Sequence, residues 1–449
     1  MPAQTPQPAR IALARIARRY ATPLRLAYLA CIAIATLLHL DADPSLANAF
    51  VRLQRALAPH IGFRDVIDAA RNVALFLGWG ATCVLTSDAP ATRRGVLVAT
   101  VTGMLASIAV ESLQLFSPFR TASIVDVATN TLGSLLGAMT VWLVEARATG
   151  DMRRGTLIGV PGWLPAGSLL LMSFGLAFAP STRASRIVAW AASPLERARV
   201  VAGTAAVEVP WTALTTDAVA WLVVGLAVAV AIDDRAGRIR IGQFAAWLMI
   251  VPGLLFIAHA GRAMAGLQRE AGSAMVQSVA AAFGLVLGLL LVPRWRATVT
   301  ARSTRALQLG LLTAAVGAMI SWSPATWAVR AGGGGFSWRQ LVPMMSLFQR
   351  QDLSSVFLVL QKAGLGAAVG ACLAARTRVG EPRPGIRIAA AYAAAIELGQ
   401  FLVPGRFPDM TDALITLAAA CLVAVLVERA AREVPSGDPL ERPALNGHR

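Results

Sequence analysis

The chain has 449 residues, of which 56% are hydrophobic and only 14% are charged, and its mean hydropathy is +0.61. A soluble globular domain has about 45–50% apolar and about 25% charged residues. This composition excludes a disordered chain, a fibrous repeat and an ordinary cytosolic enzyme. It predicts a protein that is mostly embedded in lipid.

The net charge of +17 would suggest nucleic-acid binding in a soluble protein. Here the basic residues lie in short segments between apolar runs, which is the pattern of a membrane protein. The four cysteines all fall inside apolar runs without a C-x-x-C pair, and the four histidines are scattered. We therefore expect no nucleic-acid partner, no metal site and no cofactor.

About 20 apolar residues form a helix that crosses the ~30 Å hydrocarbon core of a bilayer. Continuous apolar runs without strand alternation predict an all-α polytopic membrane protein with about twelve transmembrane helices. The distribution of arginines along the intervening segments favours cytoplasmic locations for both termini. The predicted spans are 24–40, 66–86, 95–117, 122–146, 156–179, 213–232, 243–260, 273–292, 306–324, 353–376, 386–404 and 410–428.

An internal repeat is the most informative feature of the chain. Two copies share the pattern E-x2-Q-x3-P-x-R-x5-D with identical spacing. A looser match aligns residues 66–80 with 356–370, so that Asn72 corresponds to Lys362, the only lysine. The residues of the pattern are Glu111, Gln114, Pro118, Arg120 and Asp126 in the first copy and Glu397, Gln400, Pro404, Arg406 and Asp412 in the second.

The repeat predicts two parallel four-helix units, pointing the same way through the membrane, on either side of a central four-helix segment. The predicted parts of the chain are a cytoplasmic N-terminal segment (1–23), a first unit (24–146), a central transmembrane segment (156–292), a second unit (306–428) and a polar tail (432–449).

The spacing within each copy predicts that polar side chains converge at the outer end of a helical hairpin. Glu111 and Gln114 share one helix face, and Pro118 ends that helix. Asp126 begins the returning helix, and Asn130 follows four residues later on the same face.

A charged side chain in the middle of a bilayer costs ~3 kcal/mol or more, so it normally pairs or lines a watery cavity. We expect Lys362 to pair with Glu397, and an arginine to pair with the glutamate of each hairpin. Two interpretations remain open: a polar pocket that opens outward, or ion pairs that only lock the helices together.

These residues resemble the VanZ-like family of bacterial membrane proteins. Asn72, Phe76 and Gly80 resemble the family's N-x3-F-x-P-x-G run, with Gly78 in place of the proline. The first hairpin resembles its E-x2-Q … R … D-x3-N-x2-G-x3-G pattern, and the second hairpin has Thr416 in place of the asparagine. The resemblance implies two VanZ-like units in one chain, a location in the bacterial cytoplasmic (inner) membrane, and a link to glycopeptide (teicoplanin-type) resistance.

The expected function is that of a non-enzymatic cell-envelope protein whose outward-facing polar pocket binds an anionic lipid headgroup, a sugar or an envelope intermediate. Its expected partners are membrane lipids and a cell-envelope glycan or lipid-linked precursor. The alternatives are a membrane transporter and an intramembrane enzyme acting on a lipid-linked substrate. The predicted ligand-binding residues are Asn72, Glu111, Gln114, Arg120, Asp126, Asn130, Lys362, Glu397, Gln400, Arg406 and Asp412.

Overall fold

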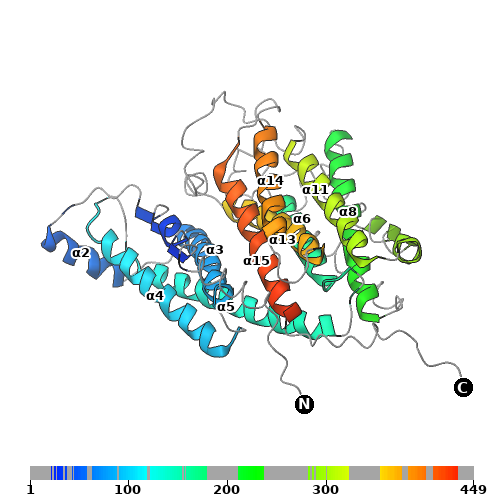
Figure 1. The fold of residues 1–449 in the computed structure, drawn as a ribbon. Helices are drawn as coiled ribbons and strands as arrows, with labels where there is room; N and C mark the ends of the chain where they lie inside the picture. The colour runs from blue at the N-terminus through cyan, green and yellow to red at the C-terminus, as the bar shows by residue number, and fades with distance from the viewer. Residues whose placement is uncertain are drawn as a thin grey trace, which may run out of the picture.

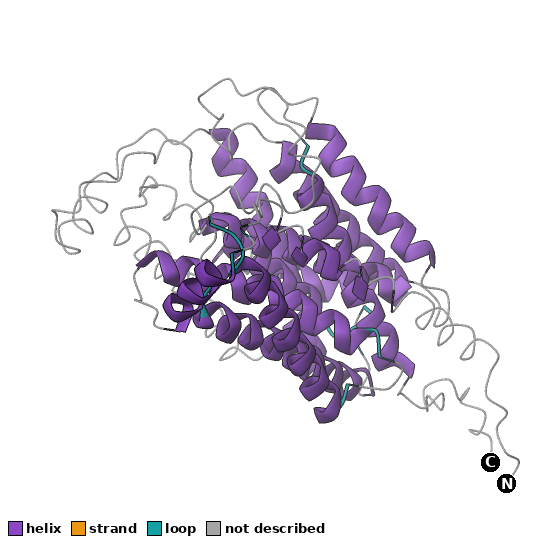
Figure 2. Cartoon of the chain, turned by 90° about the vertical axis from the view of Figure 1, so that its left-hand side faces the viewer, coloured by secondary structure: helices purple, strands orange, loops and turns teal. Residues whose placement is uncertain are grey.

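The regular elements of the protein are all helices in the parts that a computed structural model describes (Figure 2). The all-α prediction is therefore confirmed for this part of the chain. The described residues are 45–57, 63–87, 91–118, 122–153, 158–178, 211–236, 290–299, 301–322, 354–376, 383–400 and 408–432, with shorter stretches within 22–43 and 282–287 and the single residue 156.

Ten helices are defined within these residues, and Figure 1 shows how they are arranged. Helices α3, α4 and α5 lie on one side of the molecule and α8 and α11 on the other, with α13 and α15 between them. The helices are α2 (Leu46–Leu57), α3 (Phe63–Leu85), α4 (Arg93–Gln114), α5 (Ile124–Arg153), α6 (Trp163–Phe178), α8 (Trp211–Ala236), α11 (Arg302–Trp322), α13 (Ser354–Arg376), α14 (Arg383–Gly399) and α15 (Met410–Arg432).

Five of the described helices contain segments long and apolar enough to cross a membrane, namely Arg93–Gln114, Ile124–Arg153, Arg302–Trp322, Phe357–Ala375 and Met410–Ala431. Helices α3, α6, α8 and α14 also coincide with predicted spans. The predicted span 243–260 lies outside the described residues, as do most of 273–292 and part of 24–40. The total of twelve spans therefore stays a prediction.

Short polar side chains fix where the long helices begin. Thr92 precedes α4, and its hydroxyl accepts a hydrogen bond from the backbone N–H of Gly95 at 3.1 Å. Ser123 caps α5 in the same way, and Asp409 caps α15. Such caps satisfy backbone donors that have no partner within the helix.

Glycines bring the paired helices of each unit into backbone contact. A Cβ atom at Gly137 of α5 would overlap the carbonyl of Leu77 of α3. A Cβ at Gly80 of α3 would likewise overlap the carbonyl of Ser134 of α5. In the second unit, at the positions that the repeat aligns with these, a Cβ at Gly370 of α13 would overlap the carbonyl of Ala420 of α15. Small residues at these crossings allow the helices to approach closely without a large apolar side chain between them.

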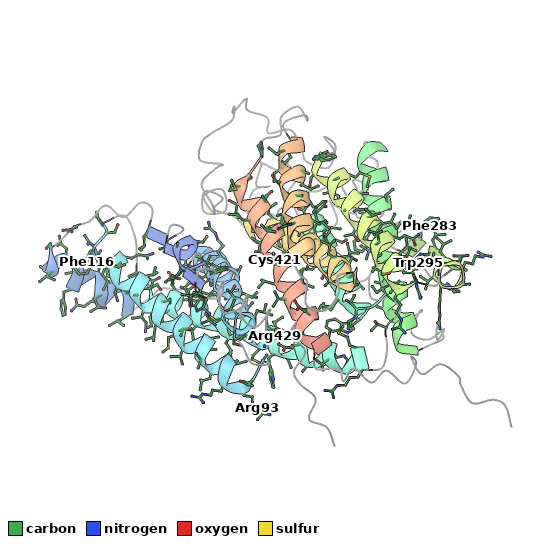
Figure 3. All side chains as sticks on the ribbon, in the orientation of Figure 1. Arg93, Phe116, Phe283, Trp295, Cys421 and Arg429 are labelled. Carbon is green, nitrogen blue, oxygen red and sulfur yellow. The ribbon has the colours of Figure 1, made fainter. Side chains whose placement is uncertain are left out.

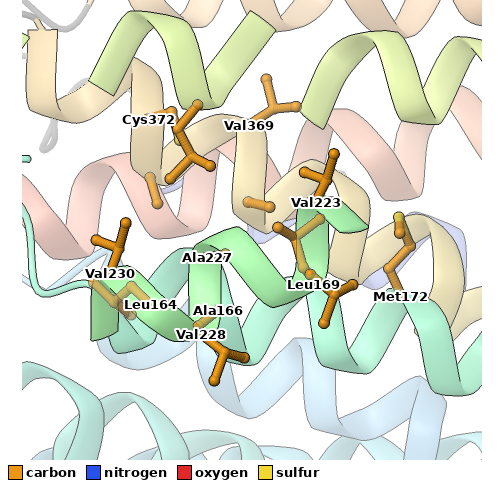
Figure 4. Close-up of a cluster of buried hydrophobic side chains, with 14 of the residues drawn as sticks. Leu164, Ala166, Leu169, Met172, Val223, Ala227, Val228, Val230, Val369 and Cys372 are labelled. Carbon is orange, nitrogen blue, oxygen red and sulfur yellow. The ribbon is translucent and has the colours of Figure 1, made fainter. Parts of the chain in front are cut away.

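An extensive apolar core joins the central segment to the second unit. Leu169 and Met172 of α6 lie beside Val223 of α8, and Val369 and Cys372 of α13 cover them (Figure 4). Helix α6 packs directly against α13, and α8 packs against α6 and α11. The described part of the central segment is therefore an integral part of the bundle.

Arg429 connects the C-terminal part of α15 to the first unit (Figure 3). Its Nε atom lies 3.1 Å from Oε1 of Glu145 on α5, and Glu145 is only 3% exposed. Its Nη1 atom donates to the carbonyls of Val84 and Leu85 at the end of α3, at 3.0 and 3.1 Å. One guanidinium therefore neutralises a buried carboxylate and caps a helix of the other unit.

We expect Arg429→Gln to lower the free energy of unfolding by about 3–5 kcal/mol, because Glu145 would lose its guanidinium partner in a buried place. The apparent Tm of the purified protein in detergent measures this change. The double variant Glu145→Gln/Arg429→Gln should recover part of the loss. Arg147→Gln is the control, since the Arg147 side chain is 54% exposed and its pairing with Asp151 at 3.5 Å should contribute only about 0.2–1 kcal/mol.

We expect Gly137→Ala to destabilise the protein by about 1–3 kcal/mol, because the added methyl group overlaps the backbone of α3. Gly150→Ala in the same helix is the matched control. In the described part of the chain, no atom beyond the adjacent residues and backbone of the same helix lies within 4 Å of the Cβ position at Gly150, so alanine there should stabilise the helix by about 0.5–1 kcal/mol. Equal melting temperatures for the two variants would contradict the close crossing of α3 and α5.

Candidate functional site

Lys362 of α13 lies between two buried carboxylates of the second unit. The Nζ atom of Lys362 lies 3.0 Å from Oε1 of Glu397 on α14 and 3.0 Å from Oδ2 of Asp412 on α15. The three residues are 4%, 5% and 8% exposed, respectively. The predicted pairing of Lys362 with Glu397 is confirmed, and Asp412 is a second partner that the sequence analysis did not assign to this lysine. We call these three residues the lysine cluster.

The second carboxylate oxygen of Glu397 ties the end of α14 to the beginning of α15. This Oε2 atom accepts hydrogen bonds from Nε2 of Gln400 at 2.8 Å and from the backbone N–H of Asp409 at 3.1 Å. Asp409 in turn accepts a hydrogen bond from the N–H of Thr411 at 2.9 Å. Glu397 therefore links its own helix α14 to the residue before α15 and, through Lys362, to helix α13.

In the first unit, the corresponding polar residues also lie close together. Oε2 of Glu111 accepts a hydrogen bond from the backbone N–H of Ser123 at 2.9 Å. Nδ2 of Asn72 donates to Oδ1 of Asp126 at 2.8 Å. Glu111 at the end of α4 is buried, and Asn72 and Asp126 are half-buried.

The two units share these contacts at corresponding sequence positions. In both, a glutamate accepts a hydrogen bond from the backbone just before the returning helix. In both, an aspartate at the start of that helix is contacted by a polar side chain from an earlier helix of the same unit. This earlier helix is α3 in the first unit and α13 in the second. The corresponding pairs are Glu111 with Ser123 and Glu397 with Asp409, then Asp126 with Asn72 and Asp412 with Lys362.

The polar contacts of the first unit continue one helical turn deeper. Nδ2 of Asn130 donates to Oγ of Ser107 at 2.9 Å, and both residues are buried. Ser107 was missed by the sequence analysis, although its position four residues before Glu111 places it on the same face of α4. Gln114, one turn nearer to the helix end, donates to the carbonyl of Thr36 at 3.3 Å.

The two units differ in the charge of the group that approaches the aspartate. An ammonium group lies beside Asp412, whereas the neutral amide of Asn72 lies beside Asp126. Oδ1 of Asp412 is buried and has no hydrogen-bond partner among the described residues. Among the described residues, no group of three or more histidine, cysteine, aspartate or glutamate side chains could hold a metal ion.

The two arginines of the repeat, Arg120 and Arg406, lie outside the described residues. Their predicted pairing with the hairpin glutamates therefore stays a prediction. Arg71, which the sequence places next to Asn72, forms an ion pair with Asp68 at 3.2 Å on the same helix.

The apolar helices and the charged residues buried at two hairpin ends define the class of the chain as a helical membrane protein. Residues 25–145 match the model of the VanZ/LLP1 family, so this part of the chain is a VanZ-like unit. The match coincides with the predicted first unit and does not include the second. No curated protein and no solved structure matches the chain.

We expect Lys362→Met to lower the free energy of unfolding by about 3–5 kcal/mol, because two carboxylates would remain buried without the ammonium group between them. The apparent Tm in detergent measures the effect. The triple variant Lys362→Met/Glu397→Gln/Asp412→Asn should recover most of it, since no net charge would then be buried. Arg387→Met, at an exposed position of α14, is the control for the loss of a basic residue.

Proposed function

We propose that the chain is a VanZ-like protein of the bacterial cell envelope. It lies in the inner membrane with both termini in the cytoplasm, and the ends of its two hairpins bind an anionic group on the outer side. That group belongs to a lipid headgroup, a sugar or another envelope intermediate. The observation that carries the proposal is the burial of Lys362, Glu397 and Asp412 at a hairpin end, with contacts that recur in the VanZ-like first unit.

The recurrence favours a binding site over a structural lock. Ion pairs that only hold helices together need no more than the neutralisation of each buried charge. Apolar residues of similar volume in place of such a buried ion pair often give an equally stable protein. Here both units keep a glutamate and an aspartate in the same contacts, although the side chain beside the aspartate is an amide in one and an ammonium in the other. Ionisable residues that persist inside membranes usually line a functional site.

The proposal assigns the anionic group to Arg120 and Arg406. Both follow the proline of the hairpin turn by two positions in the sequence. Glu397 already accepts hydrogen bonds from Lys362, Gln400 and the backbone of Asp409. A guanidinium group binds phosphate or carboxylate through two parallel hydrogen bonds, which suits it to an anionic headgroup. If the bound group is part of a cell-wall precursor, the glycopeptide-resistance role that the resemblance implies would follow.

Native mass spectrometry of the gently purified protein tests the proposal. We expect the wild-type chain to retain an anionic lipid and Arg120→Ala/Arg406→Ala to lose it. Each lost charge-assisted hydrogen bond contributes about 1.5–3 kcal/mol, so binding should weaken by about tenfold or more. Arg94→Ala/Arg387→Ala removes the same charge from exposed positions of α4 and α14 and should leave the lipid bound.

Retention of the lipid by the double variant would contradict the proposal. If the Arg120→Ala/Arg406→Ala variant has the wild-type melting temperature and retains the same lipids in the same amounts, then the hairpin arginines do not bind the headgroup. The proposed site would then be wrong. A titration of delipidated protein in detergent with phosphatidylglycerol measures the difference between wild type and variant as a difference in affinity.

A further inference from the structure

Helix α2 (Leu46–Leu57) was not expected, because it lies between two predicted spans, and its side chains divide into three faces. Its protein-facing side carries Ala49 and Ala56, which are buried, and Arg52, which is half-buried. Its apolar stripe consists of Leu46, Phe50, Leu53 and Leu57, which are 76%, 60%, 38% and 62% exposed.

These four exposed residues follow each other at intervals of four, three and four positions, so they form one line along the helix. On the side of the helix opposite to this stripe lie Asn48, Arg55 and, at its edge, Val51, which are also exposed. At 100° per residue, the protein-facing side falls between the apolar and the polar faces. A helix that lies at a membrane surface beside a protein has this arrangement of three faces.

Arg52 anchors α2 to the end of α4. Its Nη1 atom donates to the carbonyl of Leu115 at 2.9 Å, and its Nη2 atom lies 2.6 Å from Oδ2 of Asp43. The backbone N–H of Asp43 donates to the carbonyl of Phe116 at 2.6 Å. Hydrogen bonds from Asn48, the N–H of Ser45 and Arg52 lower the pKa of Asp43. The carboxylate therefore stays ionised, and the link to Arg52 holds, at neutral pH.

This anchor fixes the depth of α2 relative to the membrane. Helix α4 is a candidate membrane span, so its C-terminal end lies at the boundary of the hydrocarbon layer. Figures 1 and 3 show α2 at the periphery of the molecule, near the α4 end that is marked by Phe116. Helix α4 exposes its own apolar residues Leu105, Ile108 and Leu113 towards this end. The apolar stripe of α2 thus adds to a surface that already faces lipid.

We propose that α2 lies in the interface of the bilayer at this end of α4, with its apolar stripe inserted among the acyl chains. The occupant of the stripe is therefore the lipid itself. Charge supports this assignment, because residues 46–57 include two arginines and no acidic residue, and the exposed Arg55 is suited to lipid phosphates. The proposal goes beyond the ligand site of the two hairpins and does not depend on it.

Site-directed spin labelling of the full-length protein tests this placement. Single cysteines at Phe50 or Leu53 report on the stripe, and single cysteines at Asn48 or Arg55 report on the polar face. The unsubstituted chain, whose four native cysteines are buried or half-buried, is the labelling blank. The labelled protein is reconstituted into vesicles of phosphatidylethanolamine and phosphatidylglycerol. Collisions of each label are then measured with oxygen, which concentrates in lipid, and with a water-soluble nickel chelate.

We expect a higher ratio of oxygen to nickel accessibility for the Phe50 and Leu53 positions than for the Asn48 and Arg55 positions. High nickel accessibility on both faces would show that α2 lies in water and would overturn the proposal. Low accessibility to both reagents, with dipolar broadening between labels, would show that a second copy covers the stripe and would equally overturn it. Leu46 and Leu57 report on the same stripe if a variant at Phe50 or Leu53 fails to fold.

Discussion

A charge inside an apolar bundle has to be neutralised where it lies, and this constraint organises both ends of the second unit. At one end, Lys362 joins α13, α14 and α15 through two carboxylates. Near the C-terminal end of α15, Arg429 joins that helix to α3 and α5 of the first unit. Because leaving any one of these charges without its partner is costly, each contact stabilises the observed arrangement of the helices that it joins.

The two units place their polar residues alike and share one close helix crossing. The hairpin contacts of Glu111 and Glu397 with the backbone are the same. Gly80 of α3 meets the backbone of Ser134 of α5, and Gly370 of α13 meets that of Ala420 of α15 at the aligned positions. Further close contacts use Gly133 and Gly137 of α5 in the first unit and Gly366 of α13 in the second. Since a crossing needs small residues but not on a particular helix, these further contacts could differ while the shared crossing and the polar contacts stayed.

The difference between Asn72 and Lys362 gives the two hairpins different electrostatic character. A neutral amide can hold a carboxylate through one hydrogen bond, whereas an ammonium group bridges two carboxylates and holds two helices together. The ion pairs of the second unit therefore join three of its helices, and this unit also packs against α6 and, through α11, against α8. The VanZ-like first unit lies beside this assembly and is attached to it through Arg429.

The sequence by itself determined that the described elements are helices and which of their polar residues share a face, because spacing within a helix fixes its faces. It also predicted the pairing of Lys362 with Glu397, because a lysine inside a bilayer needs a charged partner and this glutamate is the nearest candidate in the repeat. It also indicated the first VanZ-like unit, through residues such as Glu111 and Asp126. The tertiary structure alone decided that Lys362 also contacts Asp412, that Ser107 meets Asn130, and that Arg429 reaches Glu145. These contacts join faces of different helices, and their meeting depends on the rotation and tilt that packing imposes on each helix. Helix α2 was missed for a related reason: its twelve residues are too short and too polar for a span, and its position became visible only once Arg52 was placed against the end of α4.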